Sequence, residues 1–329
     1  MLVPQDTLRC CCINHDPLII VTYGNPMAGP AKLAPLLAGR RVYFLAGAWW
    51  SYLDLKLLHQ TVQVYKGFQA AHPEHQHVFL TNDPEEGGLL DKVGLPHFYC
   101  HHNAFIDENL FKPLPRVEKR LDAVYTARLV RLKRHVLARD IPSWGLLHGL
   151  SRNDTRKELS YLRYLRRQMP GMELLNGDPE TGEYRLFAPE QMCRAYNTAR
   201  VGLCLSAVEG GNYAAAEYML SGLPVVSTRS KGGREAFFDA EISRVVDDDS
   251  RAVAEAVAEL AARRLPPQFV RLRTLLKLKE MREDFIRLVN AILDKEGRPQ
   301  DFGERFAKVF VHKLYGYPAS PEAFVAGLV

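Results

Sequence analysis

The chain has 329 residues, enough for two domains of ordinary size, and its 47% hydrophobic and 25% charged residues are the balance of a folded globular protein, which excludes a disordered chain. Its 43 basic and 38 acidic residues leave a net charge of +5, which suits anionic partners such as nucleotides or an acidic membrane surface and gives no support to nucleic acid. Three of its six cysteines are consecutive, Cys10 to Cys12, which argues against a disulfide framework and for a reducing compartment.

The first hundred residues alternate apolar, β-branched runs with segments of helical periodicity, the pattern of a parallel α/β sheet with right-handed crossovers. Strands are predicted at Pro17–Tyr23, Arg41–Ala46, His77–Leu80 and Pro96–Cys100, and helices at Lys32–Ala38, Leu53–Ala71 and Pro84–Val93. Cys100, His101 and His102 form a small cluster at the end of the last strand, and we interpret them as ordinary loop residues and not as metal ligands. Since no CxxC pair occurs with histidines at zinc-finger spacing, we expect no metal site.

Asn103–Pro115 has two prolines and no clear period, which predicts a linker between domains. Beyond it, strands are predicted at Ala123–Thr126, Trp144–Leu147 and Gly171–Asn176, and helices at Asp154–Gln168 and Ala188–Arg200. Arg128 and Lys133 lie five apart at the start of an expected helix, where a guanidinium and an ammonium can contact one anion. The alternative is a basic helix face exposed to solvent.

Residues Val201 to Gly233 read VGLCLSAVEGGNYAAAEYMLSGLPVVSTRSKGG. The pattern predicts a strand over Val201–Leu205, a helix over Tyr213–Ser221 that Gly222 ends, and a second strand over Pro224–Ser227. Ser206, Glu209, Gly210 and Gly211 fall in the turn before the helix. Free backbone N–H groups at a helix N-terminus suit a phosphate or diphosphate. Glu209 and Glu217, eight apart, can accept hydrogen bonds from sugar hydroxyls, so the unit predicts a nucleotide-sugar site. The alternative is an ordinary α/β turn with two solvated glutamates.

Glu-x7-Glu within this unit, followed by GLPVVST, resembles the donor-binding signature of retaining glycosyltransferases of the GT-B fold, family 4-like, among the glycosyl transferases group 1. The resemblance implies two Rossmann-like domains that face each other across a cleft. It implies that Glu217 holds the ribose hydroxyls and that Glu209 contacts the donor sugar. The other donor-binding candidates are Ser206, Gly210, Gly211, Asn212 and Tyr213.

The same family uses Arg-x4-Lys to clamp the donor diphosphate, which here implies Arg128 and Lys133. With Glu209, these two residues are our catalytic candidates. The family usually has glycine before the arginine and after the lysine, where this chain has Ala127 and Arg134, so we expect a less permissive loop. The resemblance also places the hinge in the Asn103–Pro115 linker and the base contact near residues 185–188.

The N-terminal half resembles the family less closely. It is shorter than usual, and it lacks both the family's glycine-glycine loop and an evident equivalent of the histidine near the sugar. Gly24 and Gly29 are the nearest glycine candidates. Gly24, Trp49 and Trp50 are candidate acceptor or sugar contacts, and the alternative for the tryptophans is that they fill the core.

Three later segments complete the chain. The acidic run ending at Asp249 is read as the cap of a helix over Arg251–Arg263, with a metal site as the alternative. Phe269–Leu293 predicts a long amphipathic helix whose apolar side includes Leu272 and Leu276, and packing across both domains is favoured over a membrane-surface role. A last helix is expected over Asp301–Leu314, and a loosely held tail over Pro318–Val329.

We therefore predict an α/β protein with the GT-B fold, with domains over residues 1–105 and 106–300, and a C-terminal helix and tail over 301–329 that return to the first domain. The implied activity is transfer of a hexosyl group from a nucleotide diphosphate sugar to an acceptor hydroxyl, with retention, without metal or cofactor, in surface polysaccharide or glycoconjugate synthesis. The acceptor is open: a glycan, a lipid-linked group or a small molecule. Two alternatives stay open: a catalytically silent nucleotide-sugar-binding subunit, and a GT-B-like epimerase or phosphorylase.

The sequence shows no run of the roughly 18 apolar residues that a membrane span needs and no signal-peptide pattern at its start. We expect a cytoplasmic location, with peripheral contact at the inner face of the membrane as an option.

Overall fold

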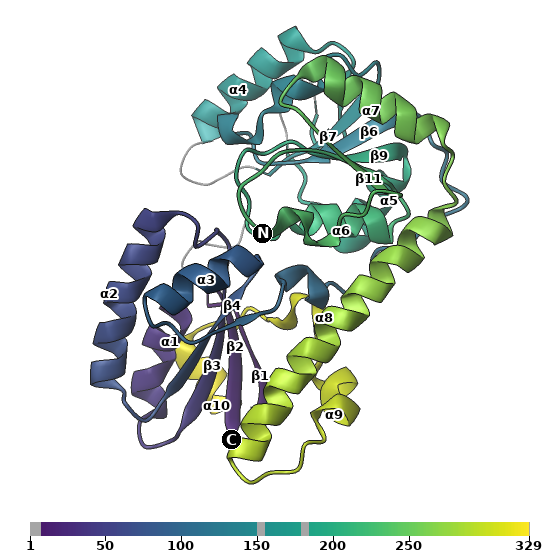
Figure 1. Ribbon diagram of the computed structural model, residues 1–329. Coiled ribbons are helices and arrows are strands. Elements are labelled where there is room, and N and C mark those ends of the chain that lie inside the picture. Colours follow the sequence, from purple (N-terminus) through teal and green to yellow (C-terminus); the bar gives the residue numbers. More distant parts are fainter. Residues whose placement is uncertain (1–7, 150–154, 179–183, 329) are drawn as a thin grey trace.

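A computed structural model describes residues 8–149, 155–178 and 184–328 and builds them on two separate sheets (Figure 1). The first sheet has the strand order β1-β2-β3-β4-β5 and the second has the order β11-β10-β9-β6-β7-β8. Each sheet has helices packed on its faces, the doubly wound arrangement in which ligands bind beyond the carboxyl ends of the strands. Those ends of both sheets point toward the space between the domains (Figure 1).

The first sheet contains the four strands that the sequence predicts and one that it does not. Its strands are β1 (Cys10–His15), β2 (Leu18–Gly24), β3 (Val42–Ala48), β4 (Gln76–Thr81) and β5 (His97–Tyr99). β2 to β5 pair in parallel, whereas β1 pairs antiparallel with β2. The cysteine triplet thus lies in an edge strand, where Cys10 and Ile13 are buried. Its helices are α1 (Ala28–Leu33), the 3₁₀ turn η1 (Ala34–Leu37), α2 (Leu55–Ala71) and α3 (Pro84–Lys92).

The second sheet is parallel throughout. Its strands are β6 (Leu121–Thr126), β7 (Trp144–Leu147), β8 (Met172–Leu174), β9 (Ala199–Cys204), β10 (Val225–Thr228) and β11 (Ser243–Val246). Its helices are α4 (Thr155–Gln168), α5 (Pro189–Asn197), α6 (Tyr213–Leu220) and α7 (Ser250–Ala262). The start of the predicted helix at Asp154 and the turn residue Pro179 lie outside the described residues.

The helix expected at Arg128 to Lys133 is wrong. The chain forms two 3₁₀ turns there, η3 (Arg131–Lys133) and η4 (His135–Ala138), separated by Arg134 at φ +49°. A left-handed residue cannot continue an α-helix. The acidic run does cap a helix: the Asp249 carboxylate accepts hydrogen bonds from the backbone N–H groups of Arg251 and Ala252, at the start of α7.

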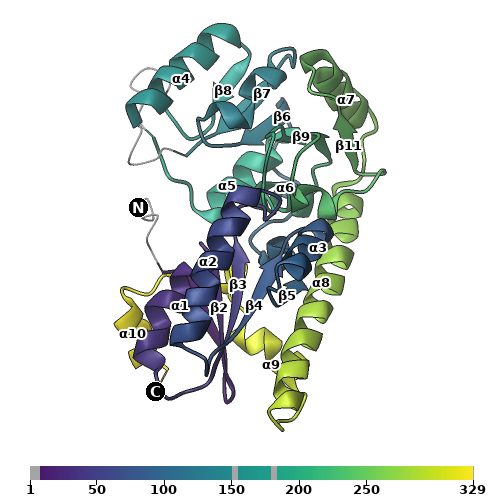
Figure 2. The same ribbon diagram turned by 60° about the vertical axis from the view of Figure 1, so that its left-hand side comes forward.

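Helix α8 (Pro267–Lys295) joins the two domains (Figure 2). Its first half packs Val270 and Leu278 into the core around α6, and its second half packs Phe285 and Val289 against the first sheet. The prediction that this helix packs across both domains is confirmed. Leu272 and Leu276 are 55% and 52% exposed, so their assignment to its apolar side is wrong.

The chain after α8 returns to the first domain. α9 (Phe302–Val309) buries Phe302 and Phe306 against α8, and the 3₁₀ turn η6 (His312–Leu314) follows. The helix predicted to reach Leu314 therefore ends early. The expected loose tail instead contains α10 (Pro321–Ala326), which contacts α1 and η1. The domain limits at residues 105, 106, 300 and 301 stay a prediction.

Candidate functional site

The loop from Ser206 to Asn212 follows β9 and lies at the carboxyl edge of the second sheet. The hydrogen bonds that hold its backbone include those from the Ala207 N–H to the Leu132 carbonyl at 3.2 Å and from the Glu209 N–H to the Lys231 carbonyl at 3.0 Å. The buried Arg234 also donates to the Ser206 carbonyl at 2.9 Å. The loops after β6, β9 and β10 are thus tied together. These hydrogen bonds restrict the backbone of the loop.

Lys133, Glu209 and Ser206 form one cluster at this edge. The Lys133 ammonium pairs with Glu209 Oε1, and the Ser206 hydroxyl donates to the same oxygen. The side chains of Lys133 and Glu209 are 16% and 15% exposed, so each keeps a small face toward the space between the domains. Arg128 is exposed, and its side chain makes no hydrogen bond or ion pair with the described residues.

Glu217 lies on α6 in a neighbouring cluster. The Tyr196 hydroxyl donates to its Oε2 at 2.8 Å, and the Lys313 ammonium lies 3.3 Å from its Oε1. Lys313 also stands 4.2 Å from the centroid of the Tyr213 ring. Since only 7% of the Glu217 side chain is exposed, this carboxylate is covered by its own chain, a feature that the sequence does not predict.

The glycine pair is where the second domain meets the first. A Cβ on Gly211 would lie 2.3 Å from His102 Nε2, and one on Gly210 would lie 2.7 Å from the Trp49 carbonyl oxygen. The Asn103 side chain donates to the Gly211 carbonyl at 2.8 Å and to that of Asn212 at 3.2 Å. Close approach between the domains therefore requires glycine at 210 and 211, whereas the left-handed residue of this loop is Asn212, at φ +50°.

Arg134 takes the place of the glycine that the resembling family has after its lysine. It adopts φ +49°, a conformation that suits glycine. Its guanidinium donates to the carbonyls of Leu205 and Arg229 and to the Thr228 hydroxyl, and it pairs with Asp248. These bonds hold the strained residue in place and tie the loop after β6 to the ends of β9, β10 and β11. Arg134, in place of glycine, therefore links the loop after β6 to the neighbouring strand ends by side-chain hydrogen bonds.

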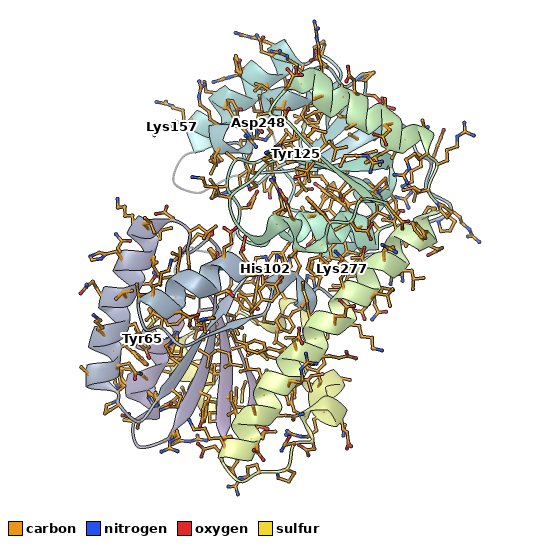
Figure 3. The ribbon with its side chains drawn as sticks, in the orientation of Figure 1. Tyr65, His102, Tyr125, Lys157, Asp248 and Lys277 are labelled. Atoms are coloured by element: carbon orange, nitrogen blue, oxygen red, sulfur yellow. The ribbon has the colours of Figure 1, made fainter. Side chains whose placement is uncertain are left out.

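Two residues at the site were not predicted as functional. His101 Nε2 lies 2.9 Å from the Gly233 carbonyl, and the His102 ring stacks on Tyr213 with centroids 4.1 Å apart, between the two domains (Figure 3). Burial lowers the pKa of His101 to about 4 and that of His102 well below its usual value, so both rings are neutral near pH 7. Their position directly after β5, at the carboxyl edge of the first sheet, is the signal that could have identified them.

The three candidate acceptor contacts lie at the facing edge of the first sheet. Gly24, at φ +123°, ends β2, and its carbonyl accepts from the Trp49 N–H at 3.3 Å. The Trp49 ring is 37% exposed and has the Arg9 guanidinium 3.8 Å from its centroid. Trp50 packs against the core of the first domain. Stacking of either tryptophan on a sugar stays a prediction.

A cavity of about 370 Å³ opens beside the glycine loop, between the start of α3 and the loop after β10. Its lining includes Asp83, Glu85, Tyr99, Lys231, Gly232 and Glu235. Both domains contribute to it, and its polar groups can donate and accept hydrogen bonds.

Residues 177–263 match the family model described as Glycosyl transferases group 1. Over this segment the chain is similar to the group 1 glycosyltransferases. It contains the glycine loop, Glu209 and Glu217, whereas Lys133, His102 and Lys313 lie outside it. No curated protein sequence matches the chain.

The solved structures that resemble the chain include glycosyltransferases. The sucrose-phosphate synthase from Thermosynechococcus elongatus has a TM-score of 0.58 and 15% identity, over 81% of this chain and 69% of that one. HepE from Anabaena in complex with UDP has a TM-score of 0.59 and 14% identity, over 82% and 78%. The UDP-forming alpha,alpha-trehalose-phosphate synthase from Burkholderia xenovorans, in complex with glucose-6-phosphate, has a TM-score of 0.54 and 13% identity, over 82% and 73%. The chain has the GT-B fold, as predicted. Among the described helices, none has the length and apolar character needed to cross a bilayer.

Proposed function

We propose that this protein is a glycosyltransferase that moves a hexosyl group from a nucleotide diphosphate sugar to an acceptor hydroxyl. The observation that carries the proposal is the Lys133–Glu209–Ser206 cluster beside the Gly210-Gly211 loop. The loop and Glu209 fall in the segment that matches group 1 glycosyltransferases. HepE was solved with UDP and with UDP-glucose, so uridine is the first base to test.

The charge that develops on a departing diphosphate requires cations and N–H donors aimed at it. Lys133 has a carboxylate partner that can exchange for a phosphate oxygen, and Arg128 is exposed and able to turn toward the same anion. In our proposal these two residues, with the backbone of the glycine loop, bind the diphosphate, and no metal takes part. Glu209 then contacts the sugar and Glu217 binds the ribose hydroxyls.

Retention is the outcome that the family resemblance implies: the donor C1–O bond breaks toward the phosphate, the acceptor oxygen bonds to C1 on the same face, and the departing phosphate takes the acceptor proton. The cavity between Tyr99 and Lys231, together with Trp49, is the proposed place of the acceptor. Surface polysaccharide or glycoconjugate synthesis, and peripheral membrane contact, remain part of this proposal.

The proposal is tested by titration calorimetry with UDP, GDP and their sugars on the full chain, followed by assay of sugar transfer and NMR of the product anomer. Because a hydrogen bond to a charged group contributes about 1.5–3 kcal/mol, Glu217→Ala and Lys133→Ala should each weaken nucleotide binding by roughly tenfold or more. Lys279→Ala, which changes a 73% exposed lysine on α8, is the matched control. Equal affinity in all four proteins would refute the site. Tight nucleotide binding without transfer to any acceptor would instead favour a silent binding subunit.

A further inference from the structure

A second cluster of ligand-type side chains lies far from the glycine loop, in the turn between α2 and β4. His72 directly follows the last residue of α2, Ala71, and the His75 N–H donates to the His72 carbonyl at 3.2 Å. This turn brings the two imidazole rings nearly parallel, 21° apart, with centroids 5.7 Å from each other. Since β4 begins at Gln76, the turn lies at the amino edge of the first sheet, opposite the edge that carries Gly24 and Trp49.

The Glu74 carboxylate faces both rings. Its Oε1 lies 4.0 Å from His72 Nδ1 and 3.6 Å from His75 Nε2. Both separations exceed the length of a hydrogen bond. The ligand atoms of all three residues lie within 4.8 Å of one another.

His75 supplies independent evidence for a ligand. It is fully buried, and neither of its ring nitrogens has the geometry of a full hydrogen bond with the described residues, although the backbones of Ala34 and Arg40 lie near enough to interact with the ring. Buried polar atoms without partners are rare in folded proteins and destabilise them.

We propose that His72, Glu74 and His75 form a Zn²⁺ site, with water as the fourth ligand. Two imidazole nitrogens and one carboxylate oxygen are a donor set that zinc accepts, at about 2.0–2.2 Å from each ligand atom. Tetrahedral geometry at that distance sets the ligand atoms about 3.3 Å apart. His72 and Glu74, 22% and 36% exposed, have the freedom to close the remaining gap around a fixed His75.

The position of this site makes its role structural. The ion would tie the end of α2 to the start of β4, on the opposite side of the sheet from sugar transfer. It would bind the folded chain in preference to the unfolded one, because His75 is oriented by its packing against Phe44 and Phe68. A ligand of this kind raises the melting temperature.

The test uses the full chain, stripped of metal with EDTA and titrated with zinc sulfate by calorimetry. We expect one Zn²⁺ per chain and a higher melting temperature when zinc is present. His72→Ala and Glu74→Gln change partly exposed side chains, so they should fold, and each should weaken zinc binding at least tenfold. His59→Ala, an exposed histidine on α2, should bind zinc as the unchanged protein does. Cobalt should give the absorption bands of a tetrahedral site, and these should disappear in Glu74→Gln.

Cys11 and Cys12 are partly buried free thiols and form a second candidate for zinc. A Cys11→Ser/Cys12→Ser variant should keep the full affinity. Zinc binding that is lost in this variant, or that is unchanged in His72→Ala and Glu74→Gln, would overturn the proposal. Neither result depends on whether the protein transfers sugar.

Discussion

Lys313 forms an ion pair with Glu217, the residue that we propose binds the ribose of the donor. It reaches Glu217 from the C-terminal segment, at φ +65°, and the next residue, Leu314, has φ +51° and is fully buried against the first sheet. Two consecutive non-glycine residues in the left-handed region are unusual. Because only 7% of the Glu217 side chain is exposed, the ribose contact proposed for this carboxylate requires Lys313 to move away.

We therefore expect Lys313→Ala to bind the nucleotide that the wild type selects more tightly. An ion pair of this exposure is worth up to about 1 kcal/mol, so the affinity should rise by up to about fivefold, as measured by calorimetry. The gain should vanish in a Glu217→Gln background, and Lys308→Ala on α9, which is exposed, should have no effect. Weaker binding in Lys313→Ala would show that the lysine contacts the ligand instead of covering its site.

The residue pattern by itself relates only those site residues that are close in the sequence, and the family resemblance adds Arg128 and Lys133. Glu209, the glycine pair and Glu217 share one strand, loop and helix unit, so their spacing is sufficient to relate them. Lys133 meets Glu209 because β6 and β9 are neighbouring parallel strands, which the sequence pattern allows but does not require. His102 and Lys313 reach the site only through contacts between the domains, which no local pattern encodes.

The loop after β10 determines how closely the two domains meet. A Cβ on Gly233 would lie 1.8 Å from the Asn82 carbonyl oxygen, a distance that no side-chain movement relieves because the obstacle is backbone. Asn82 belongs to the first domain, and its side-chain Oδ1 accepts a hydrogen bond from the His102 N–H at 2.9 Å. The main chain of the loop after β10 therefore packs directly against the main chain of the first domain, at Gly233 and Asn82.

Gly233→Ala should push these loops apart. We expect nucleotide-sugar turnover to fall at least tenfold, and the radius of gyration measured by small-angle X-ray scattering to increase. Gly88→Ala is the matched control, since Gly88 is an exposed residue of α3 with nothing within 4 Å of its added Cβ, and it should stabilise the protein by about 0.5–1 kcal/mol. Unchanged turnover and dimensions in Gly233→Ala would contradict the close contact.

At the level of elements, the strands buried on both faces were predicted well. β2, β3 and β7 lie within two residues of their predicted bounds, since a continuous apolar run has few other places in a parallel sheet. β1 was missed because Cys10–Asn14 carries no strong strand signal and pairs only at an edge. The helix at Arg128 was wrong because the φ of Arg134 is held by distant hydrogen bonds.

The whole molecule carries several buried, neutral histidines, which make its stability depend on pH. Burial lowers the pKa of His77 to about 3 and that of His101 to about 4. The unfolded chain takes up a proton near pH 6.5, whereas the folded chain does so only near these lower values. Each such histidine therefore contributes stability that is complete above pH 6.5 and is lost as the pH falls toward the folded pKa.

The free energy of unfolding should therefore fall between pH 6.5 and pH 4, by roughly 2 kcal/mol per buried histidine at pH 5, as measured by urea denaturation. His77→Phe should remove part of this dependence, because His77 packs among Tyr65, Phe68 and Phe79 and neither ring nitrogen has a partner among the described residues. His59→Ala, at an exposed position, should keep the full dependence. An identical pH profile in His77→Phe would exclude this histidine as a source.

Helix α8 constrains how the domains can move. It runs unbroken for 29 residues, roughly 40 Å. Its first half packs into the hydrophobic core of the second domain, and its second half packs into that of the first domain. Arg271 donates to the carbonyls of Glu108 and Phe111, and Arg282 donates to those of Ala104 and Ile106. The linker between the two domains is therefore hydrogen-bonded to α8. Because one continuous helix is packed into both cores, sliding of one domain along the other would disrupt the packing of α8. Lys313 precedes Leu314, which is buried in the first domain, whereas Glu217 lies on α6 of the second, so any separation of the two domains on the side away from α8 should break the Lys313–Glu217 pair.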